Sequence, residues 1–173
     1  GSLGLGESVT VSTAATISTS GAGAFGILAQ SIGGGGGLIA NDGSVFAGHT
    51  GTGSDATAGA VTVNVDGAVS ATGENSIGVF AQSSAPRGAD PITVNVNGTV
   101  AGGAGGQGVG ILVAGGNASN QINIGPNGWV WAQSGSAIKA VGTPGTQKVD
   151  GDNQGQIYGN TWLQGGSIDG NFQ

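Results

Sequence analysis

The chain has 173 residues, of which 40 are glycine, and only 7% are charged, against about 25% in ordinary soluble domains. Three Lys and Arg residues against nine acids give a net charge of −6, which excludes nucleic-acid binding and polybasic membrane contact because both need clustered cations. No apolar run approaches the roughly 20 residues of a spanning helix, so no membrane insertion is expected. Without cysteine, the chain has no disulfide and no thiolate metal site.

The glycine content favours an all-β fold with many tight turns. Collagen would need glycine at every third position and abundant proline, whereas only 4 prolines occur here. A mean hydropathy of +0.13 argues against disorder. Val and Ile favour strands, and frequent glycine disfavours helices. Gly1-Ser2 resembles a tag-cleavage scar with no signal peptide after it, and we expect one domain over residues 3–173.

Internal repeats are the main signal in the chain. Residues 9–31 align without gaps on residues 61–83, and nine of these 23 aligned residues are identical. A third copy begins at Ile92 and needs one extra residue before Val109. A fourth copy, from Ile122 to Val141, is weaker, and a fifth, from Lys148 to Ile168, is barely visible.

Each clear copy contains three short strand signals. In the first, Val61, Val63 and Val65 alternate with polar residues, which is typical of a strand with one buried face. Asp-Gly or Asn-Gly then turns the chain, a second strand carries one central valine, and a glycine-rich corner leads to the third. An Asn-Gly linker also fits an antiparallel hairpin, but three strands per copy would make successive copies point in opposite directions.

Parallel stacking of the copies lets successive copies point in the same direction. It places Val61 over Ile92 and Val63 over Val94, and it lines up Ser12, Asn64, Asn95 and Asn123 in a polar outer column, where amide side chains would exchange hydrogen bonds. The predicted fold is therefore a right-handed parallel β-helix, a solenoid of about four to five coils. A loop excursion over residues 32–60 follows the first coil, and residues 132–173 form degenerate C-terminal coils or a cap.

The excursion holds four of the six candidate binding residues. Residues 38–46 predict a small hairpin, and insertions on one face of a solenoid are common binding elements, although a loop without a contact role is the simpler interpretation. The candidates are Asn41, Asp42, Phe46 and His49. A catalytic triad needs a geometry that no sequence shows, and His49 in its polar, glycine-rich loop is more simply a solvated side chain.

Trp129 and Trp131, on one face of a predicted strand, complete the candidate set. Exposed, the pair would stack on sugar rings. Buried, it would close the open end of the stack, whose unpaired strand edge invites aggregation. We favour the closing role.

The acidic residues indicate neither catalysis nor metal binding. They are scattered along the chain, whereas polysaccharide-cleaving β-helices usually need clustered carboxylates. The segment Asp150-Gly151-Asp152 begins like a calcium loop, but Thr161 stands where an EF-hand has Glu, so a polar turn is favoured. No catalytic residue, metal or cofactor is assigned, and we expect the chain not to be an enzyme.

Two segments carry a family resemblance. The first is residues 26–37, in which Gly-Ile-Leu-Ala-Gln-Ser-Ile is followed by five glycines, and the second is the similar sequence Gly-Val-Phe-Ala-Gln-Ser at residues 78–83. They resemble the glycine-rich passenger repeats of proteobacterial autotransporters, which belong to type V secretion. The resemblance covers about residues 9–131 and implies a right-handed β-helix exported through the outer membrane to the bacterial surface or released from it. It supplies no catalytic residue.

The expected function is that of an adhesin, biofilm or structural stalk module. Its partners would be protein or glycan ligands on host or neighbouring cells, or further copies of itself. The alternative is a polysaccharide-binding or polysaccharide-active β-helix. Ice binding is a third possibility, disfavoured because the outer column mixes Thr, Ser and Asn.

Overall fold

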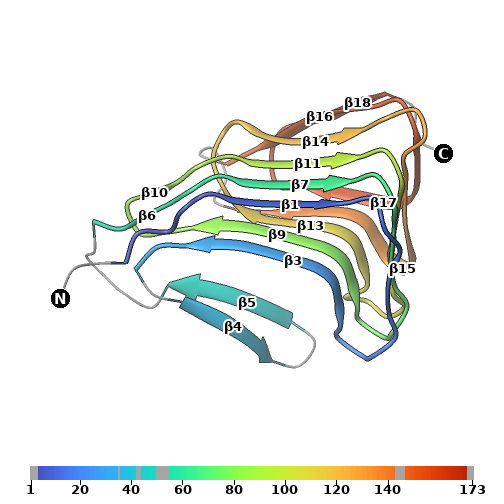
Figure 1. The fold of residues 1–173 in the computed structure, drawn as a ribbon, viewed down its shortest axis with the longest axis horizontal. Helices are drawn as coiled ribbons and strands as arrows, with labels where there is room; N and C mark the ends of the chain where they lie inside the picture. The colour runs from blue at the N-terminus through green and yellow to red at the C-terminus, as the bar shows by residue number, and fades with distance from the viewer. Residues whose placement is uncertain (1–3, 35, 42–43, 50–54, 143–146, 171–173) are drawn as a thin grey trace.

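The computed structural model describes residues 4–34, 36–41, 44–49, 55–142 and 147–170. These residues form an all-β protein without any helix, and most of its strands are parallel (Figure 1). Gly1-Ser2 lies outside the described residues.

The first sheet collects one strand from each of the five copies of the repeat and adds a sixth strand, β18. Its strand order is β1 (Val9–Thr13), β7 (Val61–Val65), β11 (Ile92–Val96), β14 (Asn120–Ile124), β16 (Val149–Asn153) and β18 (Ile168–Gly170). Every neighbouring pair is parallel. Val61 pairs with Ile92 and Val63 with Val94, as predicted, so the antiparallel alternative is excluded.

The second sheet contains two further strands from each of the first three copies and one long strand from each of the fourth and fifth. One row is β2 (Ile17–Thr19), β8 (Ala68–Ala71) and β12 (Thr99–Gly102), and the other is β3 (Phe25–Ile32), β9 (Ile77–Ser84) and β13 (Val109–Gly115). The long strand β15 (Trp129–Val141) pairs with both rows, and β17 (Gln156–Leu163) pairs with β15. In Figure 1 the row of β3, β9 and β13 runs opposite in direction to the first sheet.

The register follows the sequence alignment. Val9 pairs with Val61, Ile17 with Val69 and Phe25 with Ile77, so the gap-free alignment of the first two copies holds in all three strands. The extra residue of the third copy lies between Ala101 and Val109. Ile168, expected within the fifth copy, instead lies in β18 and adds a strand to the first sheet.

The core lies between the two sheets and is built from the inward columns. Val61, Val63 and Val65 are fully buried, and Val69, Val100 and Val130 close the core from the second sheet. The fifth copy keeps this pattern poorly, because Gly151 and Asn153 occupy the positions next to Ile122 and Ile124. Those two substitutions explain why its repeat is hard to see in the sequence.

The 32–60 insertion includes the predicted hairpin. β4 (Gly36–Asn41) and β5 (Ser44–His49) pair antiparallel, and β5 passes beside β9. Near the end of the insertion, β6 (Thr57–Ala58) pairs in parallel with β10 (Gly88–Ala89).

Candidate functional site

Trp129 and Trp131 lie in β15, in the middle of the second sheet. β15 has β12 on one side and β17 on the other, so the prediction that the pair closes the end of the stack is wrong. Val130 between them is fully buried and Trp129 is 43% exposed, as expected when neighbouring strand residues point to opposite faces. The two tryptophans therefore belong to the outer surface.

A third ring joins them from the next copy. Tyr158 in β17 pairs with Trp131 and is 45% exposed. The ring centroid of Trp129 lies 6.2 Å from that of Trp131, with a tilted geometry, and 6.0 Å from that of Tyr158, edge to face. Both distances fall within the range of favourable aromatic pairs. We call Trp129, Trp131 and Tyr158 the aromatic cluster.

Sequence reasoning missed Tyr158 as a site residue. It stands 27 positions after Trp131, and the repeat is too degenerate there to give the register by eye. Ile157 could have given the register. It pairs with Val130 and is fully buried like it, so the residue after it, Tyr158, takes the position of Trp131.

The described residues that neighbour the cluster in the strand register and along the strands are uncharged. Thr99 and Gln156 flank Trp129 in the register, and Ala101 lies beside Trp131. The next residues along the strands are Asn127, Gly128, Ala132, Gln133, Gly159 and Asn160. Amide and hydroxyl groups are thus the hydrogen-bonding groups beside the rings.

Three of the four hairpin candidates, Asn41, Phe46 and His49, lie on other strands than the tryptophans. Asn41 pairs with Ser44, Phe46 with Ile39 and His49 with Gly36 along β4 and β5. Asp42 lies outside the described residues. The structure thus places β5, which carries Phe46 and His49, beside β9, and the tryptophans on β15.

The first sheet presents a ladder of amide side chains on its outer face. Asn64 donates to Ser12 over 3.1 Å, Asn95 to Asn64 over 2.8 Å, and Asn123 to Asn95 over 2.9 Å. The predicted polar column is therefore hydrogen-bonded from one copy to the next. Asp66 and Asn97 add a parallel link of 3.1 Å, and these residues line a broad, open polar groove.

The Ala-Gln-Ser motif that supports the family resemblance has a structural role. Gln30 donates to Gln82 over 2.9 Å. The Ser31 hydroxyl donates to the carbonyl of Glu7 and accepts from the amide of Gly59, whose own carbonyl accepts from Ser83. Both serines are buried. They hold the returning end of the 32–60 insertion against the stack.

Acidic side chains are distributed over several elements. Asp66 follows β7, Glu74 lies after β8, Asp90 precedes β11, and Asp169 lies in β18. Within the described ranges no group of three or more His, Asp or Glu residues is arranged to hold a metal ion.

The segment that begins like a calcium loop is strand β16. The ammonium group of Lys148 pairs with Asp150, which also accepts from the amide of Ser167. The Lys148 hydrogen bond, aided by that of Ser167, holds the pKa of Asp150 below its ordinary value of 3.8. Asp152 accepts a hydrogen bond from Gln154, so both aspartates already have partners within the chain.

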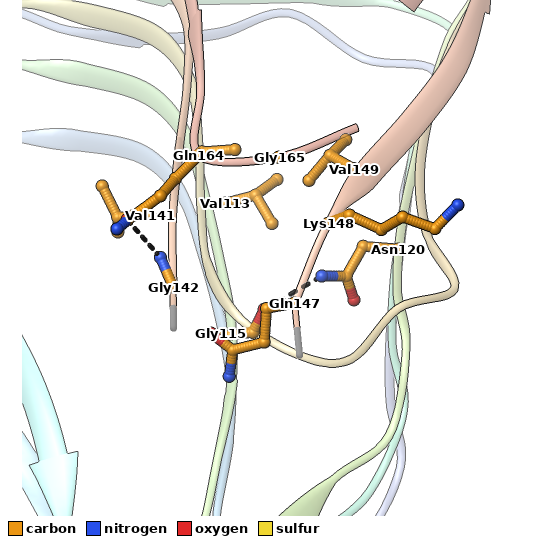
Figure 2. A pocket seen from close by; sticks show the side chains of 11 residues that line it. Val113, Gly115, Asn120, Val141, Gly142, Gln147, Lys148, Val149, Gln164 and Gly165 are labelled. Atoms are coloured by element: carbon orange, nitrogen blue, oxygen red, sulfur yellow. Dashed lines mark hydrogen bonds between the residues drawn. The ribbon is translucent and has the colours of Figure 1, made fainter. Parts of the chain in front are cut away.

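A small, partly open space is lined by residues of the third, fourth and fifth copies (Figure 2). Val113, Val149 and Gly165 line it, Asn120 donates to the carbonyl of Gly115 beside it, and Gly142 donates to Gln164. Its volume of about 10 Å³ admits at most a single water molecule. It is a packing gap and not a ligand site.

Parallel pairing of repeat copies thus defines this all-β protein. No model of a known protein family matches the chain, and no curated protein or solved structure matches it either. The described residues include no helix of the length and apolar character that crossing a membrane requires.

Proposed function

We propose that the chain is a right-handed parallel β-helix that serves as a stiff adhesive or spacer module of an exported bacterial surface protein. The observation that carries this proposal is the register: copies that recur in the sequence lie in register in the sheets, from Val9 beside Val61 to Asn123 beside Asp152. The alternative hypothesis is a polysaccharide-active enzyme. The described carboxylates of the chain are distributed over several elements and do not support it.

Right-handedness follows from the connections. Parallel strands in one sheet are joined by right-handed crossovers in nearly all proteins, because a twisted strand folds back onto its sheet only in that sense. Here every strand of the first sheet is joined to its parallel neighbour through strands of the second sheet.

Stiffness follows from the way the copies contact one another. Each copy is hydrogen-bonded to its neighbours through the backbone and, in the first four copies, through the amide ladder. A repeat that cannot bury its apolar face alone is stabilised only by stacking. The result is a module suited to holding a binding surface away from a cell, toward ligands of host or neighbouring cells or toward other copies of itself.

Export and surface exposure can be tested in cells that produce the protein. An epitope inserted between Gly105 and Gly106, in a turn of the third copy, should be removed by protease added to intact cells while a periplasmic marker survives. Deleting the copies should lower attachment to surfaces or to neighbouring cells. An epitope that is cleaved only after the membranes are broken would contradict surface exposure, and unchanged attachment would contradict the adhesive role.

A further inference from the structure

We propose that the aromatic cluster of Trp129, Trp131 and Tyr158 is a binding platform for a neutral glycan. This inference names a ligand class for the adhesive role proposed above and rests on that role only for the source of the glycan. Binding itself is measurable on the purified chain.

The first support is that the repeat does not need these rings. The outward positions of the second sheet are Ala68 and Ser70 in the second copy and Thr99 and Ala101 in the third. These small residues pair in the same register as Trp129 and Trp131. The large rings therefore occupy positions that small residues fill in the two preceding copies.

The second support is exposure. Trp129 and Tyr158 keep nearly half of their surfaces in solvent, although they lie together on one face 6.0 Å apart. Leaving so much apolar area in water is unfavourable, at roughly 25 cal/mol per Å². A ligand that covers both rings recovers that free energy.

Trp131 packs against Trp129 at a ring-centroid distance of 6.2 Å. Its Nε1 atom is closed off from solvent and has no hydrogen-bond partner among the described residues, so this N–H group is not available to a ligand. Its contact with Trp129 fixes the tilt of the more exposed ring. The platform is therefore preorganised, which lowers the entropic cost of binding.

The class of ligand follows from the chemistry of the surface. The negative face of an aromatic ring attracts the weakly positive C–H groups on one face of a pyranose ring. Gln156, which pairs with Trp129, and Asn127 and Asn160, which lie two positions along the chain from Trp129 and Tyr158, offer uncharged donors and acceptors for sugar hydroxyls. A nucleic acid would need clustered cations, whereas β15 and β17 carry a single cation, Lys139, which lies opposite Trp162 at the far end of these strands. A neutral glycan matches both the rings and the uncharged rim.

Trp162 provides a matched control. It is 48% exposed, as exposed as the cluster rings, but it lies at the other end of β17, where it faces the ammonium group of Lys139 at 6.0 Å. Its replacement removes an exposed indole without touching the cluster.

The experiment uses the purified chain and a panel of neutral polysaccharides, namely laminarin, cellohexaose, dextran and galactan. Binding is measured by intrinsic tryptophan fluorescence and by retardation in gels that contain the polysaccharide. The variants Trp129→Thr and Tyr158→Ala carry the residue types that the third copy has at these positions, so they are expected to keep the fold. Circular dichroism and the melting temperature confirm folding before binding is compared.

We expect at least one neutral glycan to bind, each cluster variant to weaken it about tenfold, and Trp162→Ala to leave it unchanged. A tenfold loss is the scale of one well-stacked ring. The proposal is overturned if no glycan of the panel binds, or if Trp162→Ala weakens binding as much as the cluster variants. Loss of a dimer in Trp129→Thr, seen by analytical ultracentrifugation, would instead assign the rings to self-association. Surface exposure in cells is a separate measurement, so the two proposals can fail independently.

Discussion

At the scale of single residues, Asn95 shows how the outer surface contributes to stability. Its amide donates to Asn64 and accepts from Asn123, and it is only partly exposed. Amides stacked at the strand spacing of about 4.8 Å can bond to the copy on either side. One side chain therefore links three copies.

Replacing Asn95 by alanine removes both of these hydrogen bonds. We expect the free energy of unfolding to fall by about 1–2 kcal/mol, since each such bond contributes about 1 kcal/mol. Equilibrium unfolding in urea measures the change. Thr62→Val is the control, because Thr62 is also an outward residue of the first sheet and its hydroxyl has no side-chain hydrogen bond in the described part of the chain. Equal losses in the two variants would show that the ladder does not stabilise the stack.

At the scale of elements, glycines at one corner set how closely the two rows of the second sheet approach. Gly26, Gly78 and Gly110 hold the same position in successive copies. A Cβ atom on Gly78 would lie 2.7 Å from the carbonyl oxygen of Gly110 and 2.8 Å from that of Ala101. Both contacts are with backbone atoms that cannot rotate away, so only glycine fits without movement of the strands.

Gly78→Ala should therefore destabilise the protein by about 1–3 kcal/mol, the usual cost of overpacking. The comparison variant is Gly106→Ala, where no atom lies within 4 Å of the added Cβ; its effect should stay within about 0.5 kcal/mol. Both values come from denaturant titrations under the same conditions. A Gly78→Ala protein as stable as the Gly106→Ala protein would show that the corner accommodates a Cβ atom without strain.

At the scale of the whole molecule, stability should depend on the position of a copy in the stack. Val94 is fully buried between Val63 and Ile122, whereas Val11 in β1 is only half-buried and has a paired strand on one side. In a stacked array each copy gains stability from its neighbours. An inner copy has two neighbouring copies, whereas the first copy has one among the described residues.

The same substitution should then have unequal effects. Val94→Ala is expected to lower the free energy of unfolding by about 2 kcal/mol, through lost burial and the cavity that remains, and Val11→Ala by about half of that. Hydrogen exchange adds a second readout, since the amides of β1 should exchange before those of β11. Equal losses at the two positions would argue against a stack with neighbour-dependent stability.

Much of the fold was predictable from the sequence because the repeat fixes register directly. The pairing of Val61 with Ile92, the amide ladder and the extra residue of the third copy all followed from aligned positions. The hairpin of the insertion followed from local turn chemistry. The assignment of Ile168 failed because the fifth copy has lost the core residues that mark its strands, with Gly151 and Asn153 in their places.

The candidate site was predicted less well. The pair Trp129 and Trp131 was found from its period of two, but its position at the end of the stack was wrong and Tyr158 was missed. For these parallel-paired repeats, the sequence by itself determined which residues face the core, because alternation and repeat length set the two faces of every strand. Only the tertiary structure decided which outward residues meet, because rings 27 positions apart become neighbours solely through the pairing of β15 with β17.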